Sequence, residues 1–147
     1  MKIKRCEMQN TTAPVIIKGQ YKGGLRNEMT HLKSNNTIFT DAPTDNHGKG
    51  EAFSPTDLVC GALAACMMTI MGITAQTHEF DIDGTTYEIK KTMAADPRRI
   101  GQIDISVNFP KHDYTDKQKA MLKAAADTCP VAKTLGSEVV INLTLNF

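Results

Sequence analysis

The sequence predicts an α+β fold in a single domain over residues 1–147. Its length of 147 residues fits one ordinary domain and is short for two. Segments with strand periodicity lie on both sides of one long uncharged segment with helix signals, and two further helices precede the last strand. No segment repeats, and this order of elements is typical of α+β domains.

The first strands are predicted between Val15 and Thr40. The segments "VIIKGQY" and "NEMTHL" are separated by "KGG" and followed by "SNN", and such glycine and asparagine residues are typical of turns. We therefore expect an antiparallel meander here. The next segment, from Asp41 to Phe53, is rich in Gly, Pro, Asp and Asn and predicts an exposed loop.

A long helix is predicted from Ser54 to about Thr77. Ser54 is the expected N-cap, Pro55 occupies the first helical position, and the carboxylate of Asp57 faces the free amides. The 18 residues from Leu58 to Ala75 carry no charge, which approaches the length of a membrane span. The flanks lack the Lys/Arg clusters and aromatic belts of spanning helices. We therefore expect the core helix of a soluble protein, with no membrane partner.

The C-terminal half predicts two strands, two helices and a final strand. "TYEIKKTMA" and "QIDISVNFP" alternate with period two, and "DPRRIG" between them contains turn residues. An amphipathic helix follows Thr115 and Asp116, and a short helix begins at Pro130 and stops at Gly136. The alternating segment "EVVINLTLNF" predicts the last strand.

Charge and composition argue against several classes of partner. Seventeen basic and sixteen acidic side chains leave a net charge of +1, and tryptophan is absent, so we expect no nucleic-acid partner. The N-terminus has no apolar stretch of a secretory signal, which predicts a cytoplasmic protein. The four cysteines form no C-x-x-C pair and have no histidine nearby. They are expected to be thiols, and neither a metal site nor a cofactor is predicted.

Two cysteines stand out by their positions. Cys129 immediately precedes Pro130 and is the predicted N-cap of the short helix, where free amides favour a thiolate; a cysteine that merely starts a helix is an equal alternative. Cys66 lies three turns into the long helix on an apolar face, where cysteine is usually a small core residue. Cys60 is six residues earlier, about 120° away around the helix, so the two thiols cannot share a pocket or a disulfide.

Two segments together resemble a known family. "SPTDLVCGALAACM" and, about sixty residues later, "DTCPVAKTL" are similar to the two signature segments of the OsmC/Ohr superfamily, the osmotically inducible and organic hydroperoxide resistance proteins. The resemblance spans roughly Tyr21 to Phe147. It implies an intertwined α+β homodimer, in which antiparallel sheets surround a long buried central helix and paired sites lie at the subunit interface.

The resemblance also implies roles for the cysteines. Cys66 would be the peroxidatic thiol, and Cys129 would resolve its sulfenic acid as a disulfide. The apolar face around Cys66, including Leu63 and Ile70, would hold the apolar part of an organic hydroperoxide. A dithiol reductant, either a lipoylated protein or a small dithiol, would then restore both thiols.

A buried thiol needs a nearby cation, because burial raises its pKa. Related enzymes use an arginine of the N-terminal sheet, held by a glutamate directly after the helix-starting proline, and Arg26 lies in the matching segment. Here Thr56 takes the place of the glutamate, and Asp57 is turned about 100° further around the helix. Glu51, in the upstream loop, is the candidate carboxylate that folds back onto Arg26. An ordinary surface arginine is the alternative for Arg26.

The predicted function is that of a thiol-dependent peroxidase in oxidative stress defence. It would reduce organic hydroperoxides, with hydrogen peroxide as a further substrate. The first alternative is a noncatalytic, redox-responsive protein that binds a hydrophobic small molecule in the same dimer. The second is a structural dimer with inert thiols. Turnover of peroxide with a dithiol separates the enzyme from both alternatives.

Overall fold

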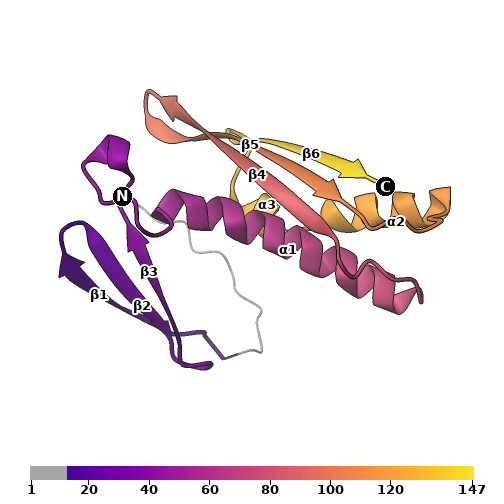
Figure 1. Ribbon diagram of the computed structural model, residues 1–147, viewed down its shortest axis with the longest axis horizontal. Helices are drawn as coiled ribbons and strands as arrows, with labels where there is room; N and C mark the ends of the chain where they lie inside the picture. Colours follow the sequence, from indigo (N-terminus) through magenta and orange to yellow (C-terminus); the bar gives the residue numbers. More distant parts are fainter. Residues whose placement is uncertain (1–12) are drawn as a thin grey trace. The chain divides into compact units, whose positions relative to one another are not determined.

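The computed structural model describes residues 13–147, so Cys6 lies outside the described residues (Figure 1). The chain forms two compact units, Met1–Phe53 and Ser54–Phe147, and each is described separately below. The elements are a mixture of strands and helices, which confirms the predicted α+β class. The single domain predicted from the chain length stays a prediction.

The first unit contains a three-stranded antiparallel sheet in the order β1-β2-β3. Its strands are β1 (Ile17–Gly23), β2 (Arg26–His31) and β3 (Asn36–Asp41), and a short 3₁₀ helix, η1 (Thr44–Asn46), follows. This is the predicted meander. The register pairs Arg26, at the start of β2, with Asp41, at the end of β3.

The first unit buries few of its side chains. Thr40 and Asp41 are the buried residues of its three strands. Large apolar side chains remain exposed on the same sheet, namely Ile17, Tyr21, Ile38 and Phe39. The sheet therefore does not form a hydrophobic core of its own among the residues that the structure describes.

The second unit begins with the long helix α1 (Pro55–Thr77), at the residues that the sequence predicts. Ser54 and Asp57 form a reciprocal capping box: the Asp57 amide donates to Ser54 Oγ, and the Ser54 amide donates to the Asp57 carboxylate. Pro55 occupies the first turn, where its missing N–H costs no hydrogen bond. Two local sequence signals therefore fix the start of this helix.

In the single chain, α1 is buried along one face. The buried residues share a single stripe: Cys60, Leu63, Ala64, Met67, Met71 and Ala75. On the other side Ile73 keeps 57% of its surface exposed. By length and apolar composition this helix could cross a membrane, a test that core helices of soluble proteins also pass.

The second sheet has the order β4-β5-β6, with β4 (Thr86–Ala95), β5 (Arg98–Asn108) and β6 (Val140–Asn146). β4 and β5 are antiparallel, and β5 begins directly after Pro97, so their turn is shorter than predicted. β6 pairs with β5 in parallel, which corrects the expectation of purely antiparallel sheets. The reason is the connection, because the chain returns through two helices to the same end of the sheet before β6 begins.

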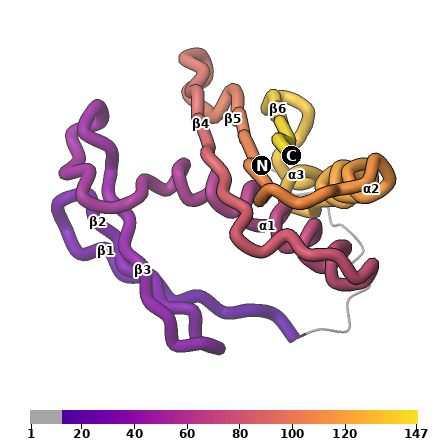
Figure 2. Tube along the Cα trace, turned by 45° about the vertical axis from the view of Figure 1, so that its right-hand side comes forward, coloured from indigo at the N-terminus to yellow at the C-terminus, as the bar shows by residue number. Residues whose placement is uncertain are grey.

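Two helices connect β5 to β6: α2 (Asp116–Ala126) and α3 (Pro130–Thr134). Together with α1, helix α2 lies on one face of the sheet (Figures 1 and 2). The core between these layers includes Ile103, Ile105 and Val107 of β5 and Leu122 of α2, all buried. The alternation of buried and part-exposed residues along β5 is the period-two pattern that the sequence predicts.

Candidate active site

Cys66 lies on the border between the buried and exposed faces of α1. It is partly buried and packs against the core cluster. Its neighbours one turn away differ, since Leu63 is buried whereas Ala62 and Thr69 are exposed. Cys66 is therefore the less buried of the two cysteines that the family resemblance singles out.

Cys129 is the N-cap of α3, as predicted, and its side chain is completely buried. In the turn between α2 and α3 the Thr128 amide donates to Ala125 and the Cys129 amide donates to Ala126, and the carbonyl of Cys129 accepts the first bond of α3 from the Lys133 amide. The start of α3 thus fixes where this second thiol lies.

The structure brings Cys66 and Cys129 together, although 63 positions separate them in the sequence. The Cys129 side chain and the backbone amide of Val131 are the neighbours that act on the Cys66 thiol. Val131 is the second residue of α3, so one free amide of this helix is directed at Cys66. Two thiols in contact need little movement to form a disulfide.

The free amides of α3 do not bind the side chain of Cys129. We expected the free amides of α3 to favour a thiolate at Cys129, but the Cys129 side chain makes no capping hydrogen bond. The amide of Val131 instead lowers the pKa of the Cys66 thiol. The cause is tertiary packing of α1 against α3, which the local Cys-Pro signal does not encode.

The pKa of the Cys66 thiol is raised above the ordinary value. The hydrogen bond with Cys129 is the main cause and burial is the second, while the Val131 amide opposes both. The neutral thiol is therefore the prevailing form at neutral pH when only these groups act on it. A reactive thiolate at this position requires an additional cation.

The remaining sequence-predicted residues of α1 divide between core and surface. Leu63 has no accessible surface, so it belongs to the core and does not line a surface that a ligand can reach; this corrects its predicted role in substrate binding. Ile70 is partly buried, one turn after Cys66, and remains a candidate. Cys60 is buried in the core, and burial raises the pKa of its thiol.

Arg26 is tightly held by two carboxylates within the first unit. Its Nε and Nη2 donate to the two oxygens of Asp41, each at 2.7 Å, and Nη2 also donates to Glu51 at 2.7 Å. Hydrogen bonds from Arg26 lower the pKa of Asp41, and in turn Asp41 and then Glu51 raise the pKa of Arg26. Glu51 thus folds back onto Arg26, as the sequence analysis expected.

Asp41 is the residue of this cluster that the sequence analysis missed, because we assigned it to an exposed loop. It ends β3 instead, directly opposite Arg26, and only 1% of its side chain is exposed. An acidic residue opposite an arginine on the neighbouring strand would have indicated this ion pair. Recognising it requires the register of β2 and β3, which the sequence alone does not provide.

Thr56 and Asp57 form a separate cluster at the start of α1. Lys91 Nζ donates to Thr56 Oγ1 at 2.8 Å and to Asp57 Oδ1 at 2.5 Å. Burial opposes ionisation of Asp57, but hydrogen bonds from Lys91 and Ser54 outweigh it, so its pKa is lowered. Asp57 therefore caps the helix and pairs with a lysine of β4.

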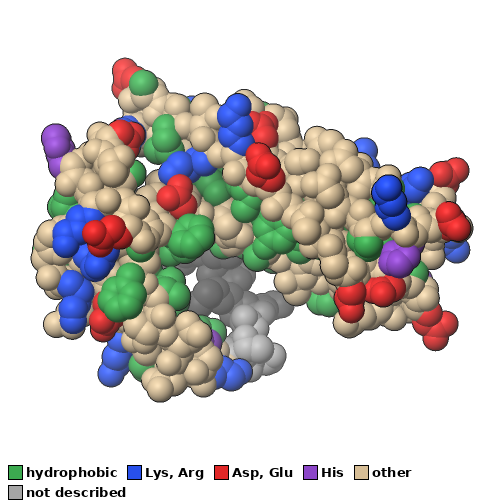
Figure 3. Space-filling view, in the orientation of Figure 1, with side chains coloured by type: hydrophobic (Ala, Val, Ile, Leu, Met, Phe, Trp, Pro, Cys, Tyr) green, Lys and Arg blue, Asp and Glu red, His purple; other side chains and the backbone are tan. Residues whose placement is uncertain are grey.

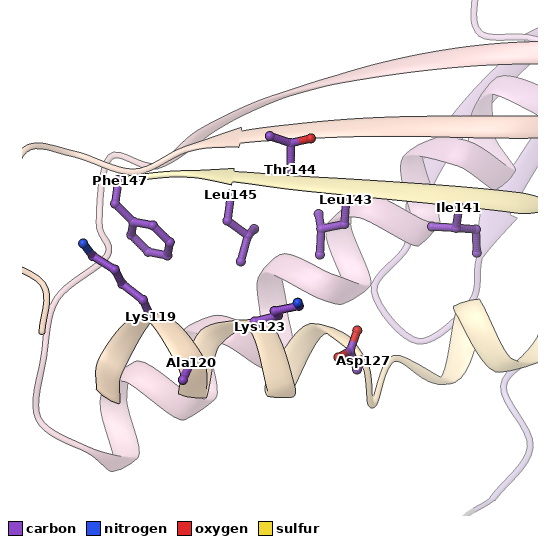
Figure 4. A pocket seen from close by; sticks show the side chains of 9 residues that line it. All are labelled: Lys119, Ala120, Lys123, Asp127, Ile141, Leu143, Thr144, Leu145 and Phe147. Carbon is purple, nitrogen blue, oxygen red and sulfur yellow. The ribbon is translucent and has the colours of Figure 1, made fainter. Parts of the chain in front are cut away.

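A groove of about 640 Å³ lies between α2 and β6, and neither Cys66 nor Cys129 lines it (Figure 4). Leu143 and Leu145 of β6 point into it, as does Phe147 directly after this strand, and Lys119 and Lys123 border it from α2. None of the sequence-predicted site residues lines it. Within residues 13–147 there is no group of three or more His, Cys, Asp and Glu side chains suited to a metal ion.

Acidic and basic side chains are interspersed on the face of the molecule that Figure 3 shows. On the described part of this face, neither sign of charge forms a continuous patch.

The fold and the site together define a class of protein: an α+β chain in which a half-buried thiol of the core helix contacts a fully buried thiol at the start of a short helix. Comparison with known proteins identifies the family. The model of the OsmC-like protein family matches residues 48–144, and the chain therefore belongs to the OsmC-like family. No curated protein matches the sequence significantly.

Solved structures support the same assignment. A Psychrobacter arcticus protein assigned to osmotic stress induction and the detoxification response is 46% identical, with a TM-score of 0.85; the match covers 96% of this chain and 100% of that one. An organic hydroperoxide resistance protein OsmC from Legionella pneumophila is 16% identical, with a TM-score of 0.72 over 94% of this chain and 100% of that one.

A third structure, the organic hydroperoxide resistance protein OhrB of Bacillus subtilis, is 19% identical, with a TM-score of 0.66 over 91% of this chain and 98% of that one. At these low identities the last two structures establish a common fold. The likeness to the OsmC/Ohr superfamily that the sequence motifs indicate is thereby confirmed.

Proposed function

We propose that the protein is a thiol-dependent peroxidase that reduces organic hydroperoxides, and hydrogen peroxide as a further substrate, in oxidative stress defence. The observation that carries this proposal is the proximity of the Cys66 and Cys129 thiols, which act on each other. Membership of a family with organic hydroperoxide resistance proteins among its structural neighbours supports the choice of substrate.

The difference in burial supports different roles for the two thiols in this proposal. Cys66 is partly accessible, so its thiolate attacks the distal peroxide oxygen; the O–O bond breaks, and the alkoxide takes up a proton and leaves as the alcohol. Cys66 is then a sulfenic acid. Cys129 has no accessible surface, so it takes the second, resolving step. Its sulfur displaces water from the sulfenic acid and forms the disulfide.

A dithiol closes the cycle, because two electrons and two protons must be returned to the disulfide. A lipoylated protein or a small dithiol supplies them and is itself oxidised to a disulfide. Arg26 is the proposed activator, because the pKa of Cys66 is raised by the groups of its own unit and a cation lowers it. The acyl or alkyl part of the substrate packs on the partly buried surface around Ile70.

The proposed working form is a cytoplasmic homodimer. The exposed apolar side chains of β1 to β3 and of the outer face of α1 support a partner subunit, because such surfaces are normally covered. The apolar composition of α1 favours burial on all sides, whereas one face is buried in the single chain.

The test is intact-mass spectrometry of the reduced protein after one equivalent of cumene hydroperoxide. Wild type is expected to lose two hydrogen atoms through a Cys66–Cys129 disulfide. Cys129→Ser is expected to gain one oxygen atom at Cys66, because the sulfenic acid has no resolving thiol. Cys66→Ser is expected to stay unmodified.

Cys60→Ala is the matched control, since this buried thiol takes no part in the proposed cycle and its removal should leave disulfide formation intact. Unmodified thiols in wild type would overturn the peroxidase. In that case the noncatalytic protein that binds a hydrophobic molecule becomes the better hypothesis, and ligand binding is the property to measure.

A further inference from the structure

We propose that Asp41 is the positioning residue for Arg26: it fixes the guanidinium so that its Nη1 edge is the donor offered to the reacting atoms. This inference rests on the proposed function, in which Arg26 activates Cys66. It assigns a role to a residue that neither the motifs nor the pattern of the related enzymes indicates.

Asp41 holds Arg26 by a bidentate pair of hydrogen bonds, which fixes the orientation of the guanidinium. Its two oxygens accept from Nε and Nη2 side by side, each at 2.7 Å, so the guanidinium can neither rotate nor slide. The carboxylate is itself anchored, because the Glu51 amide donates to its second oxygen at 3.0 Å. The strand register places the two residues directly opposite each other.

Glu51 cannot replace this function. It accepts a single hydrogen bond from Nη2, and 61% of its side chain is exposed, compared with 1% for Asp41. A single bond from an exposed side chain leaves the guanidinium free to turn and is weakened by solvent. Of the two carboxylates, Asp41 therefore sets the orientation of Arg26.

The same bonds determine which atoms of Arg26 remain available. Asp41 and Glu51 together use the one hydrogen of Nε and the two hydrogens of Nη2. Within residues 13–53 the two hydrogens of Nη1 have no hydrogen-bond partner. One cation between two carboxylates has little long-range effect on a thiol, so Arg26 acts through directed, short-range donation from Nη1.

The first experiment compares three carboxylate variants in steady-state turnover of cumene hydroperoxide with a dithiol. Asp41→Asn should lower kcat/KM about tenfold to a hundredfold, because the amide keeps one acceptor, loses the charge and faces an arginine N–H with its own N–H. Glu51→Gln should cost about fivefold or less. Glu28→Gln removes a surface ion pair with Lys22 on the same sheet and should stay within about twofold of wild type.

A second comparison separates positioning from a merely structural role. In an Arg26→Met background, Asp41→Asn should change kcat/KM by less than about twofold, because the residue through which Asp41 acts is absent. The proposal is overturned if Asp41→Asn retains wild-type kcat/KM, if Glu51→Gln costs more, or if Asp41→Asn causes the same loss with and without Arg26.

A measurement on the wild-type protein covers the case in which Asp41→Asn does not fold. The Nε–Hε signal of Arg26, assigned by its loss in Arg26→Lys, should exchange slowly with solvent at pH 7, because this hydrogen is bonded to a buried carboxylate. Exchange as fast as that of an exposed arginine would contradict the proposal. If wild type turns over no peroxide, the proposed function fails, whereas slow exchange at Arg26 still supports the positioning by Asp41.

Discussion

At the scale of single residues, neighbours distinguish one cysteine from another. Cys60 and Cys66 belong to the same helix, yet Cys60 is surrounded by the core while Cys66 contacts a second thiol and a helix amide. Periodicity alone places both on apolar faces. The pairing of Cys66 with Cys129 followed from the family resemblance, because packing between α1 and α3 cannot be read from either segment alone.

The different burial of the described thiols predicts selective alkylation. In the reduced native protein, iodoacetamide should modify Cys66 first, whereas Cys60 and Cys129, which are 2% and 0% exposed, should react only in urea. The alkylated residues are identified by peptide mapping. The rate at Cys66 should increase as the pH rises above neutral, because the thiolate is the reacting form.

The control for this selectivity is Cys66→Ser, in which the remaining described thiols should stay unmodified under native conditions. Alkylation of Cys129 at the rate of Cys66 would contradict the burial that makes Cys66 the attacking thiol. It would also remove the physical reason for assigning the resolving role to Cys129.

The contact between Arg26 and Asp41 likewise could not be predicted from the sequence alone. Their types and positions were visible, but their contact depends on the register of β2 and β3. The loop between these strands contains Ser34 and Asn35 as turn signals, and such signals do not fix where pairing begins. A shift by one residue would have placed Asp41 on the other face of the sheet, away from Arg26.

At the scale of elements, local capping signals predicted helix α1 well. Ser54, Pro55 and Asp57 act within the first turn, so their effect does not depend on the rest of the fold. The direction of β6 was harder to predict, because the side chains alternate with the same period of two in parallel and antiparallel strands. The two helices between β5 and β6 were the available sign of a parallel connection.

The Asp57 carboxylate should make the start of α1 sensitive to acid. Its pKa is lowered in the folded protein, so its contribution to stability is present above the unfolded pKa of about 3.9 and is lost as the pH falls through the lower folded value. Asp57→Asn should therefore reduce the free energy of unfolding by about 0.5–1 kcal/mol at pH 7, and by much less at pH 3.

Urea titrations of both proteins at pH 7 and pH 3 measure this difference. Asp113→Asn, at an exposed position, is the matched control and should change the free energy of unfolding equally little at both values. If Asp57→Asn lowers the free energy of unfolding equally at pH 7 and pH 3, the shape of the Asp57 side chain, and not its charge, stabilises the start of α1.

At the scale of the whole molecule, the sequence predicted more burial than a single chain provides. The uncharged residues of α1 indicated a helix covered on all sides, but one face is buried and Ile73 remains 57% exposed. The first unit likewise leaves large apolar side chains uncovered. Composition thus indicates that these surfaces are covered, but it cannot say by which molecule; the proposed homodimer supplies a second copy of the same chain.

Ile73→Glu tests the homodimer directly. In a monomer a charge at this exposed position should change stability by about 0.5 kcal/mol or less, because the side chain stays in water. In a dimer that covers this face, the unpaired carboxylate would be buried at a cost of several kcal/mol, and the subunits should separate. Size-exclusion chromatography with light scattering should therefore show a dimer for wild type and a folded monomer, by circular dichroism, for Ile73→Glu.

Lys117→Glu is the control, because it places the same new carboxylate on an exposed position of α2 and should leave the dimer intact. A wild-type monomer at all concentrations would rule out the homodimer. A dimer that survives Ile73→Glu would show that the subunits meet elsewhere and leave this face of α1 in solvent. If Ile73→Glu does separate the subunits, peroxide turnover should be measured on the resulting monomer. Activity of this monomer would show that the contact between the thiols of Cys66 and Cys129 is sufficient for catalysis, and loss of activity would show that the second subunit completes the site.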